Sequence, residues 1–477
     1  MFDNSYARLP ARFYSRVDPT PVAAPRLIKW NEELAMQLRL PFDPGERQTL
    51  ARIFSGNQLL AGSEPLAMAY AGQQFGHFVP QLGDGRAILL GEVRGADQQR
   101  HDIHLKGAGR TPYSRGGDGR AALGPVLREY VVSEAMTALG IPSTRTLAAV
   151  TTGENVFREG PVPGAILTRV AASHVRVGTF QFFSARGDVE AVRILADYVI
   201  DRHYPQIAGG AAPYLQLLRE VVARQASLVA RWLLVGFVHG VMNTDNTTVS
   251  GETIDYGPCA FLDAYDAEAV FSSIDRQGRY AYSNQAPIAQ WNLARLAETL
   301  LPLIDTDSDR AVELATEVIG GFAPLFEQQW IAGMRSKLGL TLAHPDDVGL
   351  VEQLLAIMQR TAADFTQTFR GLCDRVTAGD MDPAFNDWLL AWRKRGESES
   401  KSPQERAALM RASNPKYIPR NHRIEQLIVA AVEREDFAPF EDLLQVLKRP
   451  FDEQPAAEHY TEAPRAEERV LQTFCGT

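Results

Sequence analysis

The stretch His239-Gly-Val-Met-Asn-Thr-Asp-Asn-Thr-Thr-Val-Ser-Gly-Glu-Thr-Ile-Asp-Tyr-Gly257 decides the fold of this chain. An apolar helical pattern ends just before it, and Ser250-Gly251 predicts the tight turn of a strand–turn–strand over 247–255. Asn246 precedes this hairpin and Asp255 follows it. An Asn and an Asp on either side of a hairpin can point toward the same metal ion. Their hard oxygen atoms suit Mg²⁺ or Mn²⁺ bound to nucleotide phosphates. We therefore expect Asn246 and Asp255 to hold a divalent metal.

The stretch resembles the catalytic loop of protein kinases but departs from it at one position. In that loop the catalytic aspartate lies two residues after the histidine, where this chain has Val241, which cannot accept a proton. Asp245 is the nearby carboxylate that can act as the base instead. The alternative is that 243–246 forms only a hydrogen-bonded loop and that Asp255 ends a strand.

A lysine and a glutamate upstream favour the functional interpretation. Lys106 is the only lysine between Lys29 and Lys337, and it ends an alternating strand pattern. Glu129 follows 23 positions later, on a predicted helix. A strand lysine paired with a helix carboxylate holds nucleotide phosphates in kinase folds. Glu134 is a competing partner, and the alternative is a surface ion pair that contributes little.

The segment between this lysine and the helix, residues 106–120, contains five glycines and three arginines. Glycines let backbone N–H groups approach phosphate oxygens, and arginines supply bidentate charge. A solvated loop is the alternative. The glycine-rich loop of kinases is absent, and Gly83-Asp-Gly-Arg86 stands in its place before a strand. Arg169 and Arg176, where the sheet pattern gives way to helices, are interpreted on pattern alone as exposed residues.

The composition excludes several classes of function. The chain has 477 residues, a formal charge of −9 and three cysteines. The acidic balance argues against a nucleic-acid partner, and the few cysteines argue against a disulfide framework. No apolar run is long enough to span a membrane, so we expect a cytoplasmic protein. His101 and His104 have no carboxylate cluster near them in the sequence and do not predict a metal pair.

The order of the patterns predicts an α+β chain with a bilobal, protein-kinase-like fold. We expect an N-terminal arm over 1–60, a small sheet-rich N-lobe over 61–170 and a helical C-lobe with the catalytic loop over 171–330. A helical C-terminal extension over 331–477 is expected to pack on the C-lobe.

Five blocks of the sequence closely resemble the selenoprotein O family, kinase-fold pseudokinases that act as protein adenylyltransferases. The blocks are LPARFYSRVDPTPVAAPRLI (9–28), LGDGRAILLGEV (82–93), LKGAGRTPYSRGGDGRAALGPVLREYVVSEAMTALGIP (105–142), HGVMNTDNTTVSGETIDYGPCAFLDAYD (239–266) and NPKYIPRNHRIEQ (414–426). The resemblance implies transfer of AMP from ATP to Ser, Thr or Tyr hydroxyls of target proteins, with release of pyrophosphate and with the nucleotide inverted relative to kinases.

The resemblance also implies roles for individual residues. Lys106 pairs with Glu129 and contacts phosphates, Asn246 and Asp255 hold Mg²⁺ or Mn²⁺, and Asp245 accepts the proton. The further nucleotide contacts that it implies are Gly83, Gly85, Arg86, Asp118, Gly119, Arg169 and Arg176, which replaces the pattern-based interpretation of the two arginines.

Two alternative functions remain at this point. An ordinary phosphotransferase could use Asp245 as a displaced base, and a non-catalytic scaffold could bind ATP without transferring any part of it. The valine at position 241 supports the scaffold, whereas the intact Lys106, Asn246 and Asp255 argue against it. Redox control through Cys475, with Cys259 beside the Asp-Tyr-Gly, is a further hypothesis.

Overall fold

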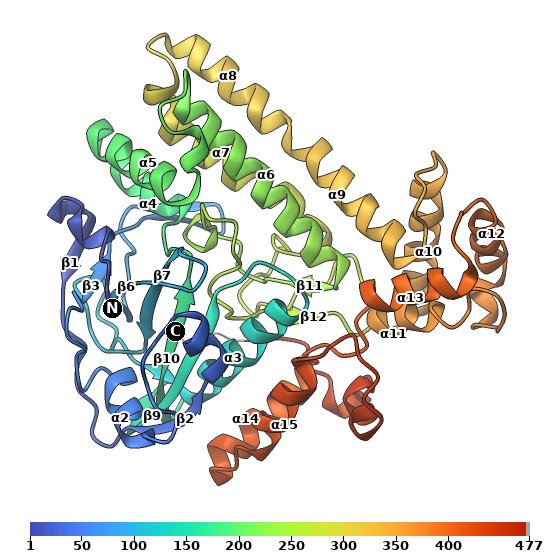
Figure 1. Cartoon of the computed structure of the whole chain (residues 1–477), viewed down its shortest axis with the longest axis horizontal. Helices are drawn as coiled ribbons and strands as arrows, with labels where there is room; N and C mark the ends of the chain where they lie inside the picture. Colours follow the sequence, from blue (N-terminus) through green and yellow to red (C-terminus); the bar gives the residue numbers. More distant parts are fainter. Residues whose placement is uncertain (474–477) are drawn as a thin grey trace.

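An antiparallel sheet organises the N-terminal part of the chain in the computed structural model, which describes residues 1–473 (Figure 1). The strand order is β1-β3-β6-β7-β10-β9-β2, and β8 pairs with β10. Lys106, at the end of β7, lies opposite Ala87 in β6 and Leu167 in β10. The strands are β1 (Tyr14–Arg16), β2 (Arg26–Trp30), β3 (Leu66–Met68), β6 (Ala87–Arg94), β7 (Arg100–Lys106), β8 (Ala121–Ala122), β9 (Arg145–Phe157) and β10 (Pro161–Ala171).

One long helix, α3 (Leu123–Ala138), packs against strands β9 and β10 of this sheet. Most of its residues are buried, which its mainly apolar sequence allows. The chain leaves the helix through Gly140, whose φ of 76° is unfavourable for residues with a side chain. The helix predicted to carry Glu129 is confirmed, and it brings this residue to the sheet.

Residues 1–60 differ from the predicted irregular arm. They supply β1 and β2, the two edge strands of the sheet, and two helices, α1 (Glu32–Gln37) and α2 (Arg47–Phe54). The apolar side chains of α2 pack into a core shared with β6, β7 and β9. The first 60 residues are thus an integral part of the sheet-rich region.

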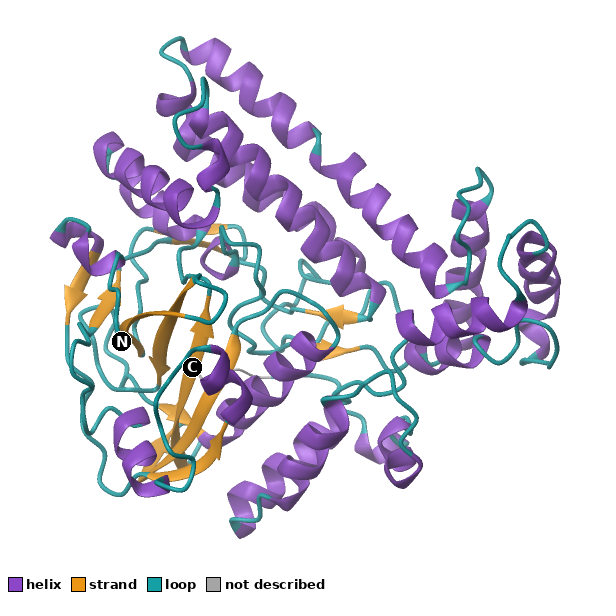
Figure 2. Ribbon diagram, viewed as in Figure 1, coloured by secondary structure: helices purple, strands orange, loops and turns teal. Residues whose placement is uncertain are grey.

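Helices dominate the chain after β10 (Figure 2). The 22-residue α6 lies at their centre and packs against α7, α8 and α9. The helices of this region are α4 (Val177–Ser184), α5 (Val189–His203), α6 (Pro213–Leu234), α7 (Gln285–Ile304), α8 (Ser308–Gly320) and α9 (Phe322–Lys337). No helix among residues 1–473 combines the length and the apolar composition needed to cross a bilayer.

The strand–turn–strand predicted over 247–255 does not form as a hairpin. The chain does turn at Gly251, with φ of 82°, but the two arms find other partners. Thr248 forms an isolated bridge with Arg176, and Thr253 forms one with Ser143. The short strands β11 (Phe237–Val238) and β12 (Ala260–Phe261) pair with each other on either side of this segment and close it into a loop.

A separate β-hairpin stands near this loop, formed by β4 (Gly72–Gln74) and β5 (His77–Val79). Backbone and side-chain hydrogen bonds join residues 73–75 of the hairpin to residues 243–245 of the loop. The two segments are 171 positions apart at the Gln74–Asp245 contact.

The C-terminal helices contact both regions of the molecule. Helix α13 contacts α9, whereas α14 and α15 pack on α3 of the sheet-rich region. Arg128 of α3 donates to Asn421 of α14 at 2.7 Å, and the rings of Tyr130 and Phe440 meet edge to face. These helices are α10 (Asp347–Thr361), α11 (Phe365–Leu372), α12 (Asn386–Gly396), α13 (Pro403–Ser413), α14 (Asn421–Arg434) and α15 (Ala438–Leu447).

A buried lysine at the end of α9 makes stability depend on pH. The Nζ of Lys337 lies 4.2 Å from the ring centroid of Phe369, and burial lowers the pKa of Lys337 to about 7. An unfolded lysine titrates near 10.5, so between these values the unfolded chain binds more protons. The contribution of Lys337 to the free energy of unfolding should therefore rise with pH by about 1.4 kcal/mol per unit across this window.

We expect Lys337→Met to raise the midpoint of thermal unfolding, and to raise it more at pH 7 than at pH 9.5. Below about pH 7 the buried Lys337 is charged, and it lowers the free energy of unfolding by the largest amount. This destabilisation decreases as the pH approaches 10.5, where the unfolded lysine also loses its proton. Methionine has no charge and causes no such destabilisation. The measurement compares midpoints of the two proteins at both pH values, with the exposed Lys394→Met as control. A difference between wild type and Lys337→Met that is the same at both pH values would contradict this account.

Candidate active site

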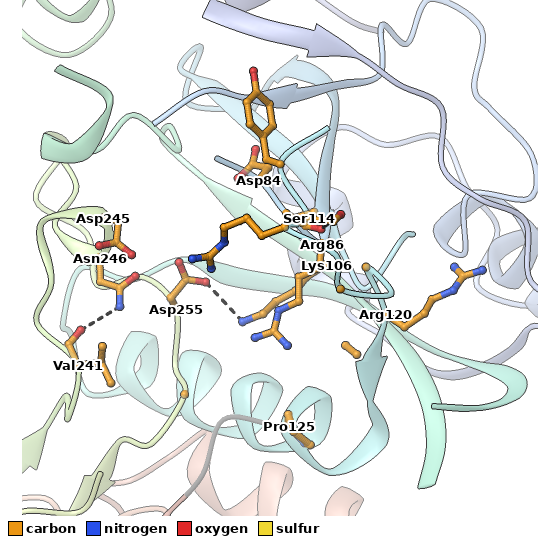
Figure 3. Close-up of a pocket in the computed structure, with 18 of the residues that line it drawn as sticks. Asp84, Arg86, Lys106, Ser114, Arg120, Pro125, Val241, Asp245, Asn246 and Asp255 are labelled. Atoms are coloured by element: carbon orange, nitrogen blue, oxygen red, sulfur yellow. Dashed lines mark hydrogen bonds and ion pairs between the residues drawn. The ribbon is translucent and has the colours of Figure 1, made fainter. Parts of the chain in front are cut away.

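A pocket of about 920 Å³ lies between the sheet, α3 and the loop that contains residues 241–257 (Figure 3). All the residues that the sequence predicts as nucleotide contacts, metal ligands or the proton acceptor line this pocket. They are Gly83, Gly85, Arg86, Lys106, Asp118, Gly119, Glu129, Arg169, Arg176, Asp245, Asn246 and Asp255. Residues from positions 83 to 255 are therefore brought to one site.

Lys106 and Glu129 form the predicted ion pair. Lys106 Nζ lies 2.5 Å from a carboxylate oxygen of Glu129, which is only 2% exposed. The competing Glu134 instead pairs with Arg145 at 2.8 Å. The burial of Glu129 contradicts the alternative of a surface ion pair, because the side chains of such a pair are exposed to solvent.

Three cations surround the carboxylate of Asp255. Oδ1 accepts from Arg169 and lies 3.4 Å from Lys106 Nζ, while Oδ2 accepts from Arg176 at 2.8 Å (Figure 3 shows the Lys106 contact). Burial alone would raise the pKa of Asp255, but Arg169, Arg176 and Lys106 hold it well below its usual range. Both arginines are only 2% exposed, so interpreting them as surface residues was wrong.

The residues present fit a divalent metal that is shared with a nucleotide. Asn246 donates its amide N–H to the backbone oxygen of Val241 at 2.9 Å, which fixes the amide plane (Figure 3). Its amide oxygen accepts no hydrogen bond within residues 1–473 and belongs to a residue that lines the pocket. No cluster of three His, Cys, Asp or Glu ligands occurs in this described range. Asn246 and Asp255 offer two oxygen ligands at most, and Mg²⁺ sites commonly take the remaining ligands from phosphate oxygens and water.

Asp245 is the second carboxylate of the loop and lies in a different environment. It is 7% exposed, and its Oδ2 accepts from Gln74 Nε2 at 3.1 Å. Burial raises the pKa of Asp245 to about 6, although Gln74 and Arg176 oppose this shift. Asp245 therefore remains ionised at neutral pH and is a stronger base than an ordinary aspartate.

The glycines of the pocket are required where two loops cross. A side chain at Gly83, whose φ is 75°, would place its Cβ 2.3 Å from the ring of Tyr113. A side chain at Gly119, whose φ is 70°, would place it 2.1 Å from the backbone oxygen of Gly109. Asp118 pairs with Arg158 at 2.8 Å, which fastens this segment to the turn between β9 and β10.

Asp84 lines the pocket and His104 lies behind it, in contact with Asp84 and Arg169. The sequence did not single out Asp84, and it set His104 aside. Both are buried, and His104 Nε2 lies 3.2 Å from Asp84 Oδ2. The other ring nitrogen accepts from Arg169 at 2.9 Å. His104 therefore supports Arg169 from behind. The available signal was an aspartate between two glycines and a histidine facing the same side of β7 as Lys106.

Gln74 is a further site residue that the sequence did not indicate. It lines the pocket and lies in β4, far from the loop in sequence. No residue pattern marks it, because its role depends only on the tertiary contact with Asp245.

The redox hypothesis concerns two cysteines, Cys259 and Cys475. Cys259 is buried, and burial raises the pKa of its thiol to about 12. A thiol with this pKa is a poor nucleophile at neutral pH. Cys475 lies outside the described residues, so the hypothesis stays a prediction.

Known proteins resemble this chain over its full length. A family model described as "Protein adenylyltransferase SelO" matches residues 1–448. A protein nucleotidyltransferase YdiU from Rhizobium rhizogenes strain K84 is 63% identical, with 100% of this chain and 97% of the relative covered. Proteins of the same name from Rhizobium meliloti strain 1021 and Rhodopseudomonas palustris strain BisB5 are each 60% identical, with 100% of this chain and 99% of each relative covered.

Proposed function

The chain belongs to the SelO family of protein adenylyltransferases, and from this we propose that its pocket transfers AMP from ATP to Ser, Thr or Tyr hydroxyls of proteins and releases pyrophosphate. The observation that carries the proposal is the ion-paired set of Lys106, Glu129 and Asp255, which shares one pocket with two buried arginines. A nucleotide triphosphate is the ligand whose charge this set can match.

We further propose that the sheet-rich and helical regions are the two lobes of a protein-kinase-like fold. The N-lobe would span 61–170, with the edge strands supplied by residues 1–60, and the C-lobe would span 171–330. The pairing of a strand lysine with a carboxylate on α3 supports this assignment, because kinases position phosphates in the same way.

The phosphates of ATP would be held by Lys106, Arg169 and Arg176. All three side chains are bound to Asp255 in the free protein. ATP offers the cations phosphate oxygens in place of this carboxylate, which leaves Asp255 free to act as a ligand. Gly83, Gly85, Arg86, Asp118 and Gly119 line the remaining wall and would contact the rest of the nucleotide.

Asn246 and Asp255 would bind Mg²⁺ or Mn²⁺, which neutralises charge on the phosphates when bound. The acceptor hydroxyl then bonds to the α-phosphorus, the bond between this phosphorus and the oxygen bridging to the β-phosphorus breaks, and pyrophosphate leaves. The proton of the hydroxyl passes to Asp245. Arg169 and Arg176 stabilise the charge that develops on the transferring group.

ATP labelled on either the α- or the γ-phosphate tests this function. We expect acid-precipitated protein to retain label from α-labelled ATP only, when the enzyme is incubated with Mg²⁺ or Mn²⁺ and a cell extract whose own kinases have been inactivated by heat. Label retained from γ-labelled ATP only would show a phosphotransferase, and label from neither would show an ATP-binding scaffold. A heat-inactivated sample controls for ATP that adheres without reaction.

A further inference from the structure

The hairpin β4–β5 contains a strained turn beside the candidate active site. Phe75 and Gly76 link Gln74 to His77, and both have positive φ, 51° and 84°. Two-residue turns of this kind favour Asn-Gly, because residues with a Cβ rarely adopt this conformation. A phenylalanine held there is a local strain that surrounding contacts must maintain.

The loop that carries Asp245, together with Tyr280, supplies these contacts. The backbone N–H of Phe75 donates to Asn243 Oδ1 at 3.1 Å, and the backbone N–H of Gln73 donates to Thr244 Oγ1 at 2.7 Å. The ring of Phe75 also packs against Tyr280, with centroids 5.1 Å apart. Three successive hairpin residues thus form hydrogen bonds with three successive loop residues, and these bonds hold the turn in its conformation.

Gln74 makes the contact in the middle of this match. Its Nε2 donates to Asp245 Oδ2, while Asp245 Oδ1 is buried and has no hydrogen-bond partner in the described part of the chain. Gly72 makes the arrangement fit, because a Cβ at this position would lie 2.2 Å from Asp245 Oδ1. The carboxylate is therefore fixed by one side-chain donor on one oxygen and by close packing on the other.

We propose that Gln74 is a positioning residue for AMP transfer, which holds the Asp245 carboxylate in the orientation that receives the proton of the acceptor hydroxyl. Gln74 itself touches neither Lys106 nor Asp255 among the described hydrogen bonds and ion pairs, so it acts through Asp245. The inference rests on the proposed role of Asp245 as the base.

The test replaces the donor while keeping its size. We expect Gln74→Met to lower kcat for AMP transfer about tenfold to a hundredfold, because a hydrogen bond to a charged group is lost. The KM for ATP and the equilibrium affinity for ATP should stay within about twofold, and the midpoint of thermal unfolding should be unchanged. His77→Ala is the matched control, because His77 is exposed, pairs with Gln74 across the hairpin and does not line the pocket.

Two additional variants test the proposal even if Gln74→Met does not fold. Gln74→Glu has the same length but cannot donate when ionised, so it should repeat the kcat loss if Gln74→Met folds poorly. Asp245→Ala separates the two hypotheses: full activity in this variant would overturn the proposed base. If Asp245→Ala is inactive while Gln74→Met and Gln74→Glu match the wild type, positioning by Gln74 is wrong. A change confined to KM for ATP would also overturn it.

Discussion

Replacing Asp255 with alanine or asparagine should lower AMP transfer about 10³-fold or more. Both carboxylate oxygens of Asp255 bind buried cations, and the same side chain is the proposed anionic metal ligand. Its loss leaves Arg169 and Arg176 without their closest counterion and removes the charge that attracts the metal. Asparagine tests the charge alone, because it tolerates the left-handed backbone at this position, where φ is 59°.

The assay is transfer of label from α-labelled ATP at saturating Mg²⁺ or Mn²⁺. Asp266→Ala is the matched control, since Asp266 follows in the same segment and does not line the pocket. Calorimetry with Mn²⁺ and a non-hydrolysable ATP analogue gives a second readout, in which metal binding should weaken. An Asp255→Asn variant with more than about a tenth of wild-type activity would overturn the metal assignment.

Replacing Lys106 with methionine should lower kcat/KM for ATP about a hundredfold. The change leaves Glu129 buried without its closest partner and removes one phosphate contact, and truncating a buried charge pair has effects of this size. Lys106→Arg should not restore activity, because the guanidinium is larger and differently shaped.

Lys29→Met is the control for Lys106→Met. Lys29 forms an ion pair with Glu441 of α15 and does not line the pocket, so its loss should leave kcat/KM within about twofold. Thermal unfolding of both variants shows whether a loss of activity reflects a loss of folded protein. If Lys106→Met and Lys29→Met have equal activity, the ion pair with Glu129 has no part in nucleotide binding.

The sequence was sufficient to predict those features that depend on the pattern of neighbouring residues. Alternation located β7 with Lys106 at its end, and apolar spacing located α3 with Glu129. The sequence also predicted that Asn246 and Asp255 lie close together, because a turn at Gly251 separates them, and both side chains do line one pocket.

Features that depend on partners far away in sequence could not be predicted. The Ser250-Gly251 turn was correctly placed, but the arms of the segment pair with residues 143 and 176 rather than with each other. Arg169 resembled a surface residue because nothing in a strand pattern shows that His104, Glu129 and Asp255 surround it. Edge strands of three and five residues, β1 and β2, are too short for a reliable periodic signal.

The packing of α14 and α15 on α3 has a consequence for biosynthesis. Protein chains grow from the N-terminus, so α3 emerges from the ribosome about 300 residues before the helices that cover it. Until residue 447 has been made, this face of α3, and with it the anchor of Glu129, lacks its natural cover. A nascent chain would thus bury this face of α3 only after α14 and α15 have been made, although the strands that α3 packs on are complete by residue 171.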